Sequence, residues 1–143
     1  MFNQWQIWFF IDARSRNVIH DWLIAEKVPK EQIAAFQAKI DDLERGGPDL
    51  VPGFITATPI AAGIYKMKVK GNRGWKQLRP MCCRGPFAPH EYTILHGAVE
   101  RDNKLPKDVK KRARANLDIL LKDPGRRRRE RLTGITQTGI QRS

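Results

Sequence analysis

The sequence has few cysteines, no long hydrophobic run and a shortage of acidic residues. Among its 143 residues only Cys82 and Cys83 are cysteines, and these two are adjacent. Adjacent cysteines are a poor framework for a disulfide-stapled fold, and no second Cys or His pair stands at the spacing of zinc ligands. We therefore expect neither a disulfide framework nor a zinc site.

The hydrophobic segments are all short. None approaches the ~20 consecutive apolar residues that cross a bilayer. The apolar segment 5–11 lacks a basic leader and a small-residue cleavage site, so it is not typical of a signal peptide. The length is that of one domain, and a hydrophobic content of 41% is too high for a wholly disordered chain. These features predict a cytoplasmic globular protein without a membrane partner.

The basic excess lies in the second and third parts of the chain. The formal net charge is +12, from 27 Lys and Arg against 15 Asp and Glu. Residues 1–45 contain six basic and seven acidic residues. Residues 46–99 contain seven basic and two acidic residues, and residues 100–143 contain fourteen basic and six acidic residues. A basic surface concentrated in this way favours a polyanionic partner, most simply a nucleic acid or an acidic protein. The alternative is a solvated surface whose charge keeps the protein soluble.

Hydrophobic periodicity predicts an α+β fold. Helical spacing indicates two helices within residues 17–45, folded as a hairpin, and a third helix over residues 106–121. We expect a two-layer sandwich in which an N-terminal strand and the helical hairpin pack on a small antiparallel sheet, leaving one sheet face free. The segments with strand signals are 5–11, 64–70, 75–83 and 91–99.

The chain ends in a segment with little apolar content. We expect one domain over residues 1–123 and a flexible basic tail over residues 124–143, which begins after a helix stop at Asp123-Pro124-Gly125. Such a terminus is commonly a frayed, solvated end. Alternatively, its arginines clamp a nucleic acid by neutralising several phosphates.

The segment 64–70 predicts a basic strand face. Alternate side chains of a strand share a face, so the lysines of this segment should project together while its apolar residues pack on the other side. Neighbouring ammonium groups repel each other unless solvent or a polyanion neutralises them. The pattern therefore fits either a solvated amphipathic strand or a nucleic-acid-binding face. The lysines are Lys66, Lys68 and Lys70.

Neighbouring segments favour RNA as the polyanion. Lys76 and Arg79 lie in the next predicted strand, and Tyr92 and His96 share a face of the last strand together with Ile94. Cations bind phosphate, and aromatic rings stack on bases. Cleavage through the RNA 2′-hydroxyl needs a base, an acid and cations that stabilise the phosphorane, and lysines crowded by other cations can become bases. His96 is alternatively a packed sheet histidine.

Three short motifs follow one another along the chain. They are Tyr65-Lys66-Met67-Lys68-Val69, Gly74-Trp75-Lys76, and Leu95-His96-Gly97-Ala98-Val99-Glu100-Arg101 followed by Lys104 and Pro106. In this order they resemble the RelE/HigB branch of the RelE/ParE toxin superfamily, most closely its phage-derived HigB-like members, over residues 5–121. The resemblance implies a RelE-like two-layer sandwich. It further implies a ribosome-dependent mRNA endonuclease of a type II toxin–antitoxin pair, which acts without metal or cofactor. It also implies three partners: mRNA, the ribosome and a cognate antitoxin of the helix-turn-helix kind.

The resemblance also implies the site residues. It assigns catalytic roles to Lys66, Lys68, Lys76, His96 and Arg101. The chain departs from the family pattern at Ala98, where an aromatic residue is usual, and at Glu100, where a basic residue is usual. The residues that we expect to bind RNA are Lys70, Arg73, Arg79, Arg84, Tyr92, Lys104, Arg126, Arg127, Arg128 and Arg129. If the arginines of the tail clamp ribosomal RNA, deleting residues 126–143 should weaken ribosome binding while leaving the fold intact.

Two non-catalytic alternatives stand beside the endonuclease. One is a ParE-like relative that inhibits an enzyme such as gyrase without cutting nucleic acid. The other is a phage-encoded protein that keeps the scaffold and binds a host protein or nucleic acid. Cleavage of mRNA by the purified protein on programmed ribosomes distinguishes the endonuclease from both.

Overall fold

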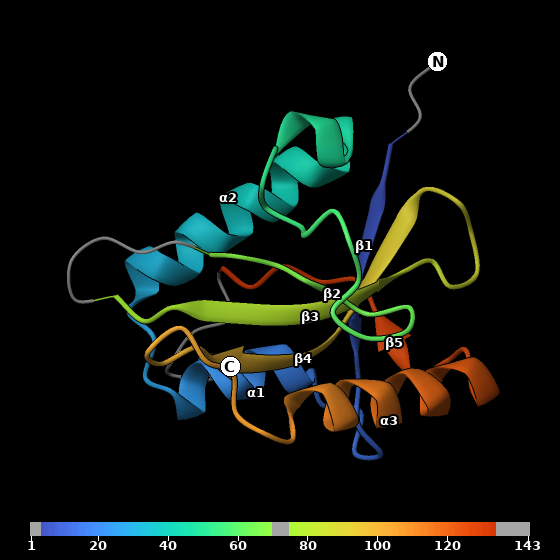
Figure 1. Ribbon diagram of the computed structural model, residues 1–143. Coiled ribbons are helices and arrows are strands. Elements are labelled where there is room, and N and C mark those ends of the chain that lie inside the picture. Colours follow the sequence, from blue (N-terminus) through green and yellow to red (C-terminus); the bar gives the residue numbers. More distant parts are fainter. Residues whose placement is uncertain (1–3, 70–74, 134–143) are drawn as a thin grey trace, which may run out of the picture.

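A mixed β-sheet of five strands forms the centre of the fold (Figure 1). The computed structural model describes residues 4–69 and 75–133. The strands lie in the order β2-β3-β4-β1-β5, with β1 parallel to β4 and the other neighbouring pairs antiparallel. The strands are β1 Gln6–Phe10, β2 Tyr65–Lys66, β3 Leu78–Arg84, β4 Glu91–Val99 and β5 Arg127–Arg128. The helices are α1 Val18–Ala25, α2 Lys30–Gly46, α3 Val109–Lys122 and a short 3-10 helix, η1 Pro48–Leu50.

The predicted α+β class is confirmed, but the segment 64–70 forms less strand than expected. β2 pairs with β3 only at Tyr65 and Lys66, and after these residues the chain makes single bridges. Burial alternates over residues 67–69, because Met67 and Val69 are 0% and 2% exposed whereas Lys68 is exposed. Tyr65 and Lys66 are both half-buried, and Lys66 and Lys68 line separate cavities, so the prediction that these lysines project together is wrong. Residues 64–69 therefore form an irregular edge of the sheet rather than a long strand.

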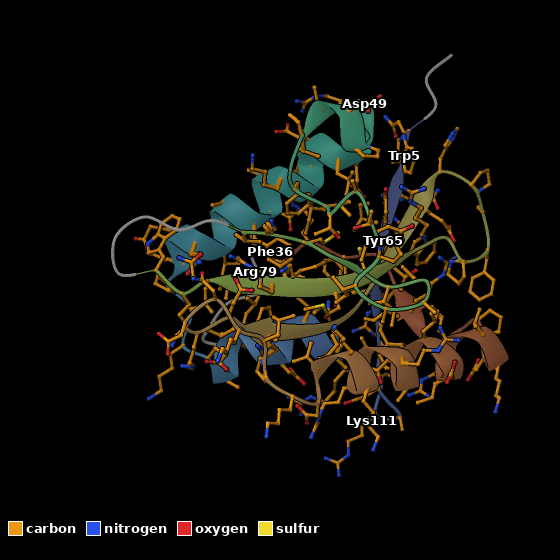
Figure 2. The ribbon with its side chains drawn as sticks, viewed as in Figure 1. Trp5, Phe36, Asp49, Tyr65, Arg79 and Lys111 are labelled. Carbon is orange, nitrogen blue, oxygen red and sulfur yellow. The ribbon has the colours of Figure 1, made fainter. Side chains whose placement is uncertain are left out.

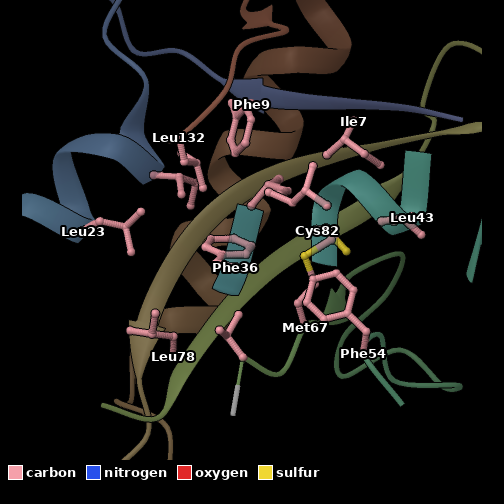
Figure 3. Packing of buried hydrophobic residues seen from close by; sticks show 14 of the residues in the cluster. Ile7, Phe9, Leu23, Phe36, Leu43, Phe54, Met67, Leu78, Cys82 and Leu132 are labelled. Carbon is pink, nitrogen blue, oxygen red and sulfur yellow. The ribbon is translucent and has the colours of Figure 1, made fainter. Parts of the chain in front are cut away.

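The sheet is covered on both faces, so the prediction of two layers with a free face is wrong. One hydrophobic cluster packs α1 and α2 against one face and includes Phe9 and Ile94 (Figure 3). A second cluster packs α3 against the other face and includes Phe10 and Leu95. Consecutive strand residues point to opposite faces, so these two apolar pairs require cover on both sides. The antiparallel pairing predicted for the strands of residues 64–99 is confirmed, because β2, β3 and β4 pair in this way. The N-terminal strand differs from the prediction, because β1 joins the sheet and is parallel to β4.

The two N-terminal helices begin and end at residues suited to these positions. The side-chain oxygen of Asn17 accepts hydrogen bonds from the N–H groups of Ile19 at 2.9 Å and His20 at 3.1 Å, which caps α1. α2 is followed by Gly47, whose φ of 76° lies in the left-handed region that favours glycine. The short connection between α1 and α2 and their shared cluster are in keeping with the predicted hairpin.

A β-bulge in β4 changes the face that His96 occupies. β4 holds one more residue than the stretch of β3 opposite it, and the extra residue is Leu95. Leu95 packs under α3, and His96 faces the same helix. The prediction that His96 shares a face with Tyr92 and Ile94 is therefore wrong, because the bulge interrupts the alternation after Ile94.

Residues 124–133 belong to the fold, so the prediction of a flexible tail is wrong for them. β5 pairs with β1 and extends the sheet by one strand. Leu132 is 1% exposed and lies beside Phe9 in Figure 3. The N–H group of Leu132 donates to the side-chain oxygen of Gln37 at 2.6 Å. Residues 134–143 of the predicted tail lie outside the described residues.

Candidate nucleic-acid interface

Two adjoining cavities lie where β4 ends and α3 begins, and both are lined by Pro106. The lysine cavity has a volume of about 570 Å³, and its charged residues are Lys66, Glu100, Lys104, Lys107 and Lys110. The histidine cavity has a volume of about 260 Å³, and its ionisable residues are Glu26, His96, Arg101, Asp108 and Arg112. We call the two cavities together the basic groove. They bring residues from β2, β4, α1 and α3 to one end of the sheet.

A tight turn after β4 shapes the groove. Arg101 and Lys104 exchange backbone hydrogen bonds of 3.0 and 2.8 Å, and the two residues between them, Asp102 and Asn103, have φ values of 52° and 60°. Asp and Asn are the non-glycine residues that tolerate this left-handed conformation best. The turn therefore brings Lys104 beside Arg101 and leads the chain into α3 at Pro106.

Glu100 holds two of the predicted cations. Its carboxylate accepts a hydrogen bond from Arg79 at 3.0 Å and lies 3.6 Å from the ammonium group of Lys66. The side chain of Arg79 is only 10% exposed, that of Lys66 17% and that of Glu100 14%. Charges withdrawn from water to this degree need a partner, so Glu100 compensates cations that would otherwise repel each other. Glu100 is thus the anion of this cluster.

His96 is a half-buried imidazole beside the start of α3. Burial lowers the pKa of His96, and the positive charge of Arg112 lowers it further, while Asp108 acts in the opposite direction. The imidazole is therefore neutral at pH 7 and able to accept a proton. Asp108 is engaged with Arg112 through a hydrogen bond of 2.6 Å.

Lys76 and Arg101 approach one carboxylate, that of Glu26 at the end of α1. The distances from Glu26 are 3.8 Å to Lys76 and 3.9 Å to Arg101. The backbone of Lys76 is fixed by the buried side chain of Gln32, which donates to the Lys76 carbonyl at 2.6 Å. Arg101 is the more accessible cation, with 66% of its side chain exposed against 35% for Lys76. A ligand that enters the histidine cavity can therefore reach Arg101 directly.

Several predicted residues lie away from the groove. Lys68 lines a separate cavity of about 210 Å³ beside α2. Arg84 stacks over the ring of Tyr65 at 5.0 Å, near the opposite end of β3. Tyr92 is 1% exposed and stacks on Trp5 with 5.5 Å between ring centroids, so its faces are not presented to a base. Lys70 and Arg73 lie outside the described residues.

The predicted arginine arm is bound to the rest of the protein. The guanidinium group of Arg127 lies 3.9 Å from the centre of the Trp8 ring and 2.7 Å from the carboxylate of Glu91. The three neighbouring arginines bind backbone or carboxylate oxygens. Arg126 donates to the Ile11 carbonyl at 3.0 Å, Arg128 to the Ser15 carbonyl at 2.9 Å and Arg129 to Glu44 at 2.8 Å. These contacts hold the segment on the sheet.

The sequence interpretation missed five ionisable residues of the groove: Glu26, Lys107, Asp108, Lys110 and Arg112. The last four lie within six residues after Pro106, so the density of charged residues at the start of the predicted helix was a signal that could have identified them. Glu26 carried no comparable signal, because the contact of α1 with the turn after β4 is long-range. The exposed side of α3 adds further cations, of which Lys111 points away from the sheet in Figure 2.

Other kinds of site find little support in the described part of the chain. Within residues 4–69 and 75–133 no three His, Cys, Asp or Glu side chains are grouped so that they could hold a metal ion. The helices of these residues include none with the length and apolar character needed to cross a membrane. Cys82 and Cys83 are buried, and burial raises the pKa of the Cys83 thiol to about 11. No protein-family model and no curated protein matches the sequence.

Proposed function

We propose that this protein is an RNA endonuclease that binds single-stranded RNA in the basic groove and cleaves it through a ribose 2′-hydroxyl. The observation that carries the proposal is the histidine cavity, in which the His96 imidazole lies with Arg101 and Arg112. The lowered pKa of His96 leaves the imidazole neutral and suited to act as a general base. The adjoining lysine cavity supplies cations for the phosphates of the same strand.

The proposed reaction needs no group from outside this chain and the RNA. His96 takes the proton of the 2′-hydroxyl, the 2′-oxygen bonds to the adjacent phosphorus, and the bond from phosphorus to the 5′-oxygen breaks. Arg101 and Arg112 stabilise the additional negative charge of the phosphorane. An ammonium group of the lysine cavity gives a proton to the leaving 5′-oxygen. The products are a 2′,3′-cyclic phosphate and a 5′-hydroxyl.

The wider proposal is a toxin of a type II toxin–antitoxin pair that acts on ribosome-bound mRNA in the cytoplasm. It is supported by the positions of the three motifs that resemble the RelE/HigB superfamily. Lys66 of the first motif lines the lysine cavity, Lys76 of the second pairs with Glu26, and residues 95–106 contribute to both cavities. An antitoxin of the helix-turn-helix kind would cover these cations with an acidic segment.

The test is cleavage of an mRNA by the purified protein with and without programmed ribosomes, with mass spectrometry of the new ends. His96→Ala and Arg101→Ala should each lower cleavage about 100-fold, roughly 3 kcal/mol of transition-state stabilisation. Arg14→Ala is the control, because Arg14 is an exposed cation in a different turn. The resemblance assigns Lys68 to the site, whereas the geometry places it in a separate cavity. Lys68→Ala should therefore lower cleavage only if the assignment from the resemblance is right. Undiminished cleavage by both groove variants would contradict the proposal.

A second candidate function is inhibition of a host protein or nucleic acid by binding alone. The observation that favours it is the pairing of predicted catalytic cations with carboxylates: Lys66 with Glu100, and Lys76 and Arg101 with Glu26. Such pairing reduces the positive charge available to a phosphorane. Under this alternative the protein binds its target through the basic groove, and no cyclic phosphate ends form under any condition of the assay.

A further inference from the structure

The lysine cavity is large enough to hold more than a phosphate group. Its volume of about 570 Å³ lies within the range of ~300–1,000 Å³ that is usual for small-molecule sites. Apart from Glu100, which is paired with Lys66 and Arg79, and Asn103, the lining consists of lysine ammonium groups and of the apolar residues Ile60, Leu105 and Pro106. A nucleotide has the same two parts, an anionic phosphate and a flat, largely apolar base.

Three lysines of this cavity are not compensated by carboxylates. Lys104, Lys107 and Lys110 are exposed, and within residues 4–69 and 75–133 none of them forms an ion pair. The fourth lysine, Lys66, already shares Glu100 with Arg79. The three uncompensated charges are held near one another by the turn after β4 and the start of α3, so an anion that enters the cavity gains attraction from all of them.

We infer that the lysine cavity is a nucleotide subsite, which binds one nucleotide of the RNA next to the cleaved bond. This inference rests on the proposed function. The phosphate of that nucleotide is held by Lys104, Lys107 and Lys110, and its base lies against Ile60 and Leu105. Because the two cavities meet at Pro106, a strand that places one phosphate beside His96 extends directly into this subsite.

Binding can be measured separately from cleavage with an RNA whose 2′-hydroxyl groups are methylated, because such RNA cannot be cut by 2′-attack. We compare the wild-type protein with the triple variant Lys104→Ala/Lys107→Ala/Lys110→Ala by fluorescence anisotropy over a series of salt concentrations. The matched control is Arg14→Ala/Lys39→Ala/Lys122→Ala, which removes the same charge from exposed positions outside the basic groove. Circular dichroism checks that both variants remain folded.

The triple variant should bind the RNA at least tenfold more weakly than the control variant. The slope of log affinity against log salt should fall by about 0.7, the value for one neutralised phosphate on a single strand. A fall near 2 would mean that the three lysines contact three different phosphates and would overturn a one-nucleotide subsite. Equal losses in the triple and control variants, or no loss in either, would overturn it as well.

Two further arms identify the ligand. Adenosine 5′-monophosphate should perturb the amide NMR signals of Leu105 and Lys107 at millimolar concentrations, whereas inorganic phosphate should perturb Lys107 without Leu105. Adenosine 5′-monophosphate that binds as tightly as the oligonucleotide would indicate a site for free nucleotides and overturn the RNA subsite. If binding follows these expectations while the wild-type protein leaves unmodified mRNA intact, the proposed endonuclease fails, and the lysine cavity remains a binding site for one nucleotide of an RNA that is not cleaved.

Discussion

Replacing Arg127 by alanine should destabilise the protein by about 4 kcal/mol, because it leaves a buried carboxylate without its cation and removes the stacking on Trp8. The Arg127 and Glu91 side chains are 11% and 3% exposed and lie 2.7 Å apart. Breaking such a pair by removing one partner costs roughly 3–5 kcal/mol. The backbone N–H groups of Phe87 and Ala88 still donate to Glu91 in the variant, which favours the lower end of this range. Loss of the stacking on Trp8 adds about 0.5–2 kcal/mol.

The assay is urea denaturation at neutral pH, followed by circular dichroism. Arg129→Ala is the matched control, because Arg129 and Glu44 are 44% and 27% exposed and a pair of this kind contributes about 0–1 kcal/mol. The double variant Arg127→Met/Glu91→Gln should be more stable than Arg127→Ala, since it contains no unpaired buried charge. Equal and small losses in Arg127→Ala and Arg129→Ala would refute the reasoning, because they would mean that β5 does not contribute to the stability of the fold.

Three other predictions concern the core and the histidine cavity. Leu132→Ala should lower the free energy of unfolding by about 2–5 kcal/mol. Deleting residues 126–143 should lower it further, and an unchanged melting temperature of the truncated protein would contradict the structure. Gly97→Ala should cost about 1–3 kcal/mol in the same assay, because its added methyl group would overlap the Trp22 ring and force α1 to move. Because the folded-state pKa of His96 lies below its ordinary value of 6.5, the unfolded state takes up this proton first as pH falls. As the pH falls below about 6.5, the free energy of unfolding should therefore decrease more steeply in the wild type than in His96→Gln. The cleavage rate should reach half its maximum below pH 6.5. An inflection of the rate profile above pH 6.5 would contradict the environment described for the imidazole.

Part of the candidate site was predictable because its residues belong to short, local patterns. The strand that carries His96 and the helix that follows Pro106 are marked by periodicity and by turn residues that act over a few positions. Asp102 and Asn103, which suit a left-handed turn, stand between Arg101 and Lys104. The sequence therefore placed these basic residues together at the end of a strand, where the structure has the basic groove.

The sequence alone determined the α+β class, the positions of most helices and strands, and the concentration of positive charge after residue 45. These follow from side-chain period, capping residues and composition, which depend on neighbours along the chain. Only the tertiary structure decided that β5 pairs with β1, that the bulge at Leu95 turns His96 toward α3, and that Glu26 meets Arg101. Each of these features depends on which distant segments pack together. Arg127 is an example: from the sequence its guanidinium group is expected to be exposed to solvent, but in the structure Trp8 and Glu91 surround it and it is a buried ion-pair partner.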